Sequence, residues 1–273
     1  MAKGLGSWQR APLALSIIEI VYAKRAKFPE EIQTLGDLQQ SGRYPFVEDG
    51  TIKELKVHAG PDQFQVKSED STCRVLTNAA RTVAARVMAT KLTFFDADYA
   101  DDFGGTLSRL RDVLDCWAKA ATALTLSELR LRTLDVAVPP QDVDLARWLR
   151  PSWHAGDLGK SGSQGMAIRD TALADGVMHV RVRTAEVEPG QKVIPPPDLM
   201  TAVHVRLPKS LMGPFDRPAR VAIVDVERVI GVEGLALERI ESLLTTAHAE
   251  TKAAFESVFE DSALDYFRGD DVS

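Results

Sequence analysis

The segment ELRLRTLDVA, residues 128–137, alternates leucine with arginine before it becomes mainly apolar. Because strand side chains point alternately to the two faces of a sheet, this pattern predicts a β-strand with leucines on one face and Arg130 and Arg132 on the other. HVRVR, residues 179–183, shows the same alternation with His179, Arg181 and Arg183. We therefore expect an antiparallel sheet that has one apolar face and one basic face.

A third segment, HVRL at residues 204–207, extends this pattern and contributes His204 and Arg206. Together the basic side chains of the three segments predict a surface for an acidic partner or an anionic ligand, because arginine makes bidentate contacts with carboxylates and phosphates. An ordinary solvated sheet face, paired partly with the protein's own acids, explains the same pattern and stays open as the alternative.

Further strands are predicted on both sides of residue 123 from branched apolar runs separated by turn residues. In the first half we expect turns at Gly60-Pro61 and at Glu69-Asp70-Ser71, and strands at 12–26, 52–58, 63–67, 72–76 and 82–95. In the second half we expect strands at 128–137, 166–173, 177–187, 200–208 and 219–228.

Helices are predicted where apolar residues recur at steps of three and four. Asp98 is a suitable N-cap for a helix at 99–121, and a second long helix is expected at 235–260. A short helix fits at 30–39, before a loop rich in glycine and proline. The stretches 151–165 and 188–198 are expected to be long exposed connections.

These elements predict an α+β protein of two βα-type halves, residues 1–123 and 124–273, each an antiparallel meander with one long helix packed on one face. KLTFFDAD at 91–98 and RVAIVDVE at 220–227 run similarly from a basic residue to aspartate and favour two related halves. Coincidence between two ordinary strands explains the same similarity and stays open.

The composition limits the class of protein. With 45% hydrophobic residues in 273, the chain can bury a sizeable core, and its N-terminal MAKGLGSWQRAP lacks the apolar region of a signal peptide. We expect a cytoplasmic protein that does not enter a membrane. Cys73 and Cys116 belong to no metal or redox motif, and the net charge of −6 argues against a dedicated nucleic-acid binder.

His248 is the candidate for catalytic or metal chemistry on the second long helix. A zinc site on one helix favours a second ligand four residues later, where this chain has the cation Lys252. We therefore expect His248 to lie at the edge of the packed helix face and to form a hydrogen bond with the sheet or a loop. General acid–base work and a partner contact stay open.

Asp96 and Asp98, at the end of the 82–95 strand, are weak candidates for a Mg²⁺ site of the phosphoryl-transfer or nuclease type. Helix capping and first-turn acids explain the same aspartates, because the helix dipole favours negative charge at that end.

Three short motifs resemble a sporadically distributed, functionally uncharacterised family of bacterial proteins. They are Pro12-Leu13 before a strand with Glu19, Leu131-Arg132-Thr133-Leu134-Asp135 in mid-chain, and His248 with Phe255-Glu256 near the C-terminus. The family pattern is P-L-x-E, then L-R-Y-I-N, then L-H-x(6)-F-E. This chain departs from it at Leu15, Thr133, Asp135 and Ala247. The resemblance spans nearly the whole chain and implies a bacterial protein of an accessory or defence-type locus, with His248, Phe255 and Glu256 in structural roles.

These observations lead us to expect a non-catalytic binding protein, such as an antitoxin, an immunity factor or a chaperone-like component, without a cofactor. A protein partner is expected. A nucleotide or RNA ligand, and self-association through an acidic helix, stay open. The alternatives are a metal-dependent phosphodiesterase or nuclease that uses Asp96 and Asp98, and a structural subunit of a larger assembly.

Overall fold

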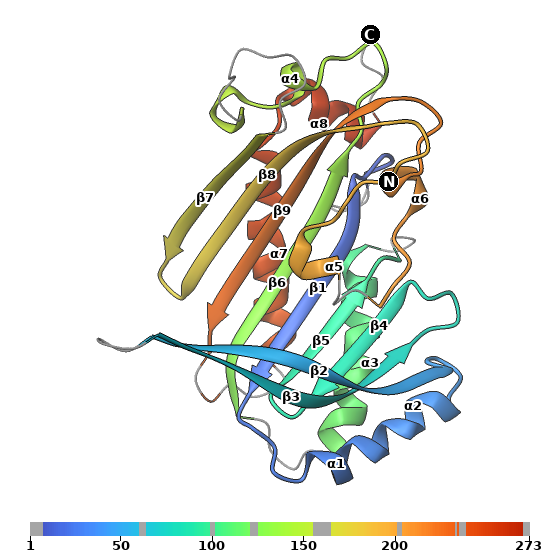
Figure 1. The fold of residues 1–273 in the computed structure, drawn as a ribbon, viewed down its shortest axis with the longest axis vertical. Helices are drawn as coiled ribbons and strands as arrows, with labels where there is room; N and C mark the ends of the chain where they lie inside the picture. Colours follow the sequence, from blue (N-terminus) through green and yellow to red (C-terminus); the bar gives the residue numbers. More distant parts are fainter. Residues whose placement is uncertain are drawn as a thin grey trace.

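A single antiparallel sheet forms the centre of the molecule. The computed structural model describes residues 8–59, 64–98, 102–120, 125–154, 165–200, 204–232, 234 and 239–269. Within these residues nine strands pair in the order β2-β3-β4-β5-β1-β6-β9-β8-β7. The strands are β1 (Leu13–Tyr22), β2 (Phe46–Ala59), β3 (Phe64–Thr77), β4 (Val83–Met88), β5 (Lys91–Asp96), β6 (Leu126–Ala137), β7 (Gly165–Leu173), β8 (Gly176–Val187) and β9 (Ala219–Gly231). The first strand of each half of the chain, β1 or β6, therefore lies at the middle of the sheet (Figure 1).

The predicted α+β class with an antiparallel sheet is confirmed, and several predicted strands need correction. A turn at Glu69-Asp70-Ser71 is wrong, because all three residues pair with β2 inside the continuous strand β3. The turn at Gly60-Pro61 falls outside the described residues. The strand predicted at 82–95 is two strands, β4 and β5. The strand predicted at 200–208 is also wrong, since residues 204–208 form an irregular connection.

The two long helices are α3 (Phe103–Ala120) and α7 (Ile240–Glu256), close to their predicted ranges. The short elements are α1 (Phe28–Glu31), η1 (Ile32–Leu35), α2 (Gly36–Gln40), α4 (Leu145–Trp148), η2 (Pro151–Trp153), α5 (Pro197–Met200), α6 (Lys209–Met212) and α8 (Asp261–Arg268). The helix α8 was not predicted; it begins after a break at Ser257–Glu260. Across the described ranges, no helix is long and apolar enough to cross a membrane.

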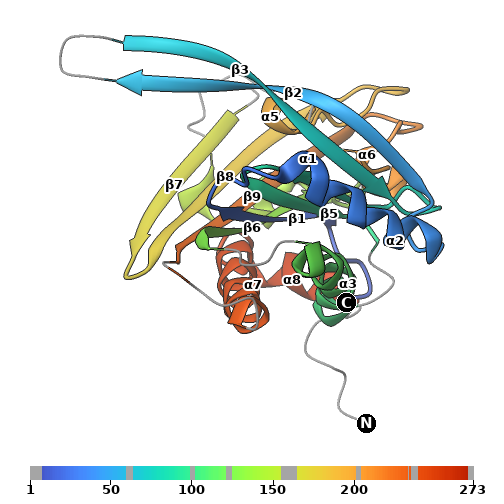
Figure 2. The same ribbon diagram turned by 90° about the horizontal axis from the view of Figure 1, so that it is seen from below.

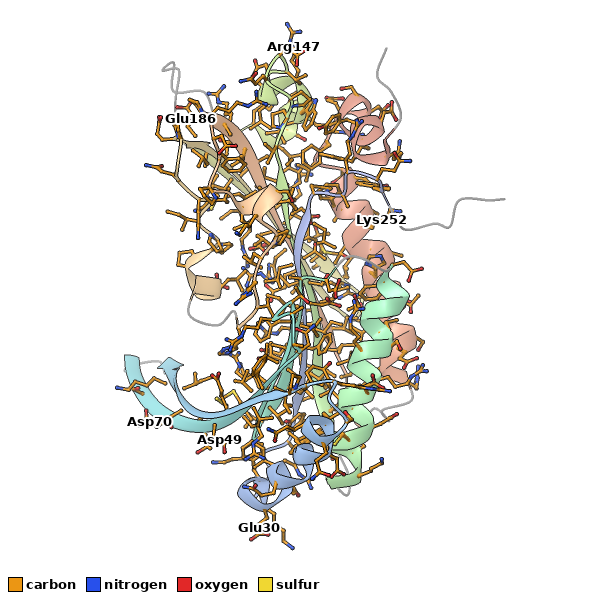
Figure 3. All side chains as sticks on the ribbon, turned by 90° about the vertical axis from the view of Figure 1, so that its right-hand side faces the viewer. Glu30, Asp49, Asp70, Arg147, Glu186 and Lys252 are labelled. Carbon is orange, nitrogen blue, oxygen red and sulfur yellow. The ribbon has the colours of Figure 1, made fainter. Side chains whose placement is uncertain are left out.

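The two faces of the sheet differ in what covers them. Figure 2 shows α3, α7 and α8 together on one side, which we call the helix face, and the β2–β3 hairpin and α5 on the other. Figure 3 gives the same separation from the side, with Lys252 on α7 and Asp70 on the hairpin at opposite sides of the sheet. Ile18, Ile20 and Tyr22 of β1 are buried under the helices with Leu131 of β6 and Trp117 of α3.

The opposite face, which we call the charged face, is covered over part of its area by the connection between β8 and β9. Val193, Leu199 and Met212 of this connection pack with Ile17 and Ile223 of the sheet in a second apolar layer. The rest of this face carries the charged side chains of the middle strands. Of the two predicted long connections, 188–198 is mostly exposed, as expected, with Val193 packed on the sheet, and most of 151–165 lies outside the described residues.

The similarity between KLTFFDAD and RVAIVDVE does not extend to side-chain direction. Asp96 pairs with Ser16, and its carboxylate contacts Arg109 of α3 on the helix face. Asp225 contacts Arg132 and Arg181 on the charged face. The two aspartates occupy the same position in the motif but opposite sides of the sheet, so this motif gives no structural support to a repeat.

The central strand β1 should dominate the stability of the fold. Ile18 is fully buried between the two long helices and the sheet, so Ile18→Ala is expected to lower the free energy of unfolding by about 3 kcal/mol. Met166→Ala on the edge strand β7, where the side chain is 60% exposed, should cost less than about 0.5 kcal/mol. Urea unfolding followed by tryptophan fluorescence measures both, and equal costs would contradict this assignment of the core.

Candidate functional site

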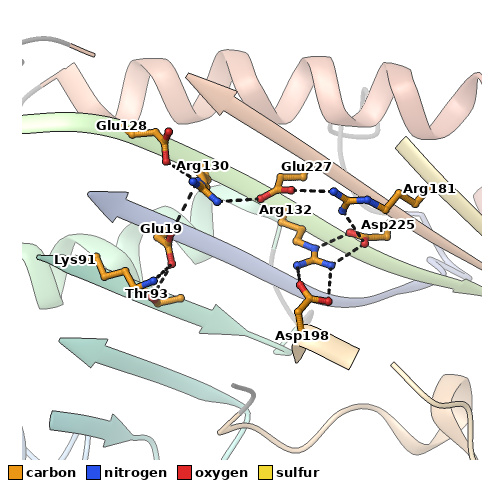
Figure 4. Close-up of polar contacts among 10 residues, drawn as sticks. All are labelled: Glu19, Lys91, Thr93, Glu128, Arg130, Arg132, Arg181, Asp198, Asp225 and Glu227. Atoms are coloured by element: carbon orange, nitrogen blue, oxygen red, sulfur yellow. Dashed lines mark hydrogen bonds and ion pairs between the residues drawn. The ribbon is translucent and has the colours of Figure 1, made fainter. Parts of the chain in front are cut away.

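The arginines of β6 and β8 share the charged face, as their alternation predicts, and carboxylates lie among them. Arg130 and Arg132 of β6 and Arg181 of β8 form a continuous network with acids from β1, β6, β9 and α5 (Figure 4). The acids of the network are Glu19, Glu128, Asp198, Asp225 and Glu227. The expected basic face is therefore a face of mixed charge.

Arg132 has the most complete set of partners. Its Nε and Nη2 atoms donate to the two oxygens of Asp225 at 2.7 Å each. Its Nη1 atom donates at 2.5 Å to Asp198, which reaches the sheet from α5 and has a side chain that is 61% exposed. Burial alone would lower the pKa of Arg132, but the hydrogen bonds to Asp225 and Asp198 outweigh it and raise the pKa above its ordinary value. Arg132 thus holds one sheet carboxylate and one carboxylate from outside the sheet.

Arg130 and Arg181 extend the network along the sheet. Arg130 Nε donates to Glu128 at 2.6 Å and lies 3.8 Å from Glu19. Glu227 lies between the two arginines, 3.7 Å from Arg130 and 3.6 Å from Arg181. Chains of such alternating charges screen one another, so no single arginine presents a bare positive charge.

The other predicted members of the basic face divide into two groups. His179 pairs with Asp170 of β7 at 2.7 Å, and Arg183 donates to the carbonyl oxygen of Ile194. His204 and Arg206 are not strand residues, which corrects their predicted placement. The His204 ring contacts Phe95 edge-on at 5.9 Å, and partial burial followed by the charge of Arg86 lowers its pKa.

A cleft of about 590 Å³ opens on this face, between the sheet and the α5 segment. Its basic lining residues are Arg86, Lys91, Arg130, Arg132, Arg181 and Arg183. Its acidic lining residues are Glu19, Asp198, Asp225 and Glu227. The acids could have been found in the sequence, because Asp225 and Glu227 alternate with valine in VDVE just as the arginines alternate in HVRVR. Among the lining residues the basic side chains outnumber the acidic ones, and Glu128, which pairs with Arg130, lies beside the cleft.

The weak metal candidates lie away from this cleft. Asp96 is fully buried on the helix face, and Arg109 Nη2 donates to its Oδ2 atom at 2.7 Å. Asp98 contributes its carbonyl oxygen to Arg109 at 3.1 Å. Among the described residues no three His, Cys, Asp or Glu side chains form a group that could hold a metal ion. Arg109 therefore occupies the place beside Asp96 that a cation would need.

A second, smaller pocket lies on the helix face beside His248. It has a volume of about 90 Å³ and is lined by Trp8, Thr133, Asp135, His248, Lys252 and Phe255, among others. Trp8 stacks with Phe267 at 6.0 Å, and Lys252 Nζ lies 5.5 Å from the centroid of the Trp8 ring. Aromatic and aliphatic walls thus surround a few polar groups.

Asp135 is the unusual residue of this pocket. It is 6% exposed, and in the described part of the chain no cation forms an ion pair with it. Burial, with a smaller contribution from the charge of Asp225, raises the pKa of Asp135 to about 7, and a hydrogen bond from Thr133 opposes this rise. At neutral pH its carboxyl group is therefore divided between the protonated and the ionised form.

His248 packs as predicted, at the edge of the helix face. Its ring stacks on Phe103 of α3 with centroids 4.1 Å apart. Burial and then the charge of Lys252 lower the pKa of His248 to about 4, so that the imidazole is neutral at pH 7. Its Nδ1 atom is buried and, within the described ranges, has no hydrogen-bond partner, so this ring atom does not form the expected hydrogen bond to the sheet or a loop.

The three family-like motifs come together around this pocket. Pro12 and Leu13 from the first motif, Thr133 and Asp135 from the second, and His248 with Phe255 from the third all line it. Glu256 does not line it and is only partly buried at the end of α7. Each of these residues stands out within its own motif, but no sequence pattern indicates that the three motifs lie side by side.

The Asp96–Arg109 pair should be required for stability. Because Arg109→Met leaves the fully buried Asp96 carboxylate without this cation, we expect a loss of about 3 kcal/mol in the free energy of unfolding. Arg111→Met is the matched control on the same helix, since Arg111 is 60% exposed and exposed ion pairs contribute little to stability. Urea unfolding compares the two, and an equal loss would refute the buried pair as a stabilising contact.

Asp135 should make stability fall as the pH rises. Its folded-state pKa of about 7 lies above the ordinary 3.8, so the folded protein binds more protons between these values and loses stability up to about pH 7. Asp135→Asn removes this titration, so its advantage over the wild type should grow by about 3 kcal/mol between pH 4.5 and pH 8. Urea unfolding at both pH values tests this. The control Asp261→Asn, at a side chain that is 90% exposed, should show no such growth.

No family model matches the chain, and neither a curated protein nor a solved structure does so. The resemblance to the bacterial family stays a prediction that rests on the three motifs.

Proposed function

We propose that this chain is a non-catalytic binding protein whose cleft on the charged face holds an acidic segment of a protein partner. The observation that supports this most directly is the contact between Arg132 and Asp198. A carboxylate supplied from outside the sheet, on the α5 segment, lies against a sheet arginine that already holds Asp225. Such a contact is a model for how the cleft would receive a partner's carboxylate.

The charge distribution of the cleft favours an acidic partner over a basic one. Six basic side chains line it against four acidic ones, although the whole chain carries a net charge of −6. A positive region on a negative protein directs association toward one surface, because potentials complementary to the partner steer the encounter.

The shape of the cleft favours an extended segment. It runs across β1, β6, β8 and β9 beneath α5, and the β2–β3 hairpin lies on the same side of the sheet (Figure 2). A groove over an antiparallel sheet suits an extended chain, whose alternate side chains would meet successive arginines.

Two broader elements belong to the same proposal. An accessory or defence-type locus, with an antitoxin, immunity or chaperone-like role, is supported by the resemblance of the three motifs alone. Two related halves are supported by the strand order, in which β1 and β6 are both central and β5 and β9 lie beside them.

An acidic model peptide tests the binding proposal. A fluorescein-labelled peptide of alternating glutamate and serine should bind the wild-type protein, and its affinity should fall as salt screens the charges. Arg181→Met combined with Arg183→Met should weaken binding at least about tenfold, because two charge-assisted contacts are lost. Fluorescence anisotropy measures both effects.

Two further variants make this experiment decisive. Arg220→Met removes a half-exposed arginine of β9 that does not line the cleft, and it should leave the affinity unchanged. Asp198→Asn should strengthen binding by about three- to tenfold, since Asp198 competes with the peptide for Arg132. The proposal fails if the Arg181/Arg183 and Arg220 variants bind the peptide equally. Tighter binding of RNA, or of a second copy of the chain, would favour the corresponding alternative.

A further inference from the structure

We infer that the pocket between β6 and α7 is a binding site for a small zwitterion, an amino acid of about the size of alanine, whose ammonium group meets Asp135 and whose carboxylate meets Lys252. This inference is independent of the proposed function, because the pocket lies on the helix face and the cleft on the charged face. It rests on the arrangement of unpaired charges, the walls of the pocket and its size.

Asp135 supplies the first requirement. A carboxyl group that is 6% exposed lines the pocket, and among the described residues no cation pairs with it. Burial of an unpaired carboxylate costs free energy, which a ligand cation recovers when it enters. Thr133, from the same face of β6, adds a hydroxyl that can accept a second hydrogen bond from an ammonium group.

Lys252 supplies the opposite charge on the other wall. It lies on α7, its Nζ atom lies over the Trp8 ring, and in the described residues it forms no ion pair with a carboxylate. A simple alkylamine would satisfy Asp135 but would be repelled by Lys252, and a simple carboxylate would have the reverse difficulty. A molecule with both charges satisfies both residues.

The uncharged residues that line the pocket favour a small ligand with an apolar side chain. Trp8, Leu13 and Phe255 form apolar walls. The volume of about 90 Å³ corresponds to roughly three water molecules at their liquid volume, which is the space of one small organic molecule. His248, whose ring also lines the pocket, is neutral at pH 7 and therefore adds no competing cation.

This pocket does not have the composition of a metal site. Asp135 and His248 are the only residues in its lining of the types that commonly bind metals, and in the described part of the chain they belong to no group of three. Lys252 beside them would repel a metal cation, as it does the protonated form of His248.

Isothermal titration calorimetry with three matched probes tests the inference in phosphate buffer. L-alanine carries both charges, ethylamine only the cation and propionate only the anion. We expect saturable one-to-one binding of alanine to the full-length protein, with ethylamine and propionate at least about tenfold weaker. Absence of alanine binding, or equal binding of propionate, would overturn the inference.

Three variants assign the contacts. Asp135→Asn keeps the shape of the side chain and should reduce alanine affinity at least about tenfold. Lys252→Met should abolish the preference for alanine over ethylamine. Arg111→Met, at an exposed side chain of α3 that does not line the pocket, should bind alanine as the wild type does. Circular dichroism confirms that each variant is folded, and unchanged alanine affinity in folded Asp135→Asn would refute the role of this carboxylate.

Discussion

The pairing of β1 with β6 is the contact on which the rest of the structure depends. It joins Leu13–Tyr22 to Leu126–Ala137 along nine registered positions, with a shift between Leu13 and Leu15. All other strands are added outward from this pair, β5 on one side and β9 on the other. Since side chains alternate along a strand, the register of this one pair decides which residues of the middle strands meet the helices and which meet solvent.

Because of this register, neighbouring residues of β6 belong to two different sites on opposite faces of the sheet. On β6, Arg132 enters the cleft, while Thr133 and Asp135 enter the pocket beneath α7. The charged face stabilises its arginines with nearby carboxylates, as at Arg132 with Asp225 and Asp198. The helix face leaves one carboxylate without a cation among the described residues. On the charged face, ion pairs link the arginines and carboxylates into a network. On the helix face, Asp135 lies in a mainly apolar pocket.

Local patterns predicted much of the fold but not the pairing of distant residues. Alternation in ELRLR and HVRVR correctly predicted strands and the shared face of Arg130 and Arg181, because a period of two is a property of the strand alone. It failed at HVRL, where the neighbouring prolines and the packing of Val193, Leu199 and Met212 produce a connection in place of a strand. The turn predicted at Glu69-Asp70-Ser71 failed because pairing with β2 overrides the turn preference of those residues.

The candidate sites were only partly predictable for the same reason. The arginines were found, and the alternation in VDVE indicates that Asp225 and Glu227 share one strand face. Which acid pairs with which arginine depends on tertiary contacts that no local pattern encodes. In the sequence Asp135 is notable only because it departs from the family pattern, since nothing in LRTLD indicates a buried carboxyl group without a cation. His248 was correctly placed at the edge of the packed helix face, yet its proximity to Asp135 and Trp8 depends on how α7 lies across β6.

The sheet is thin enough for the two faces to affect each other electrostatically. The charge of Asp225, on the face opposite to the pocket, contributes to the raised pKa of Asp135. Asp225 is also the residue that Arg132 and Arg181 hold in the cleft. By thermodynamic linkage, any ligand that changes the electrostatic potential around Asp225 also changes the proton affinity of Asp135, and the reverse holds equally. A single layer of strands thus allows the cleft and the pocket, whose described lining residues do not overlap, to affect each other electrostatically.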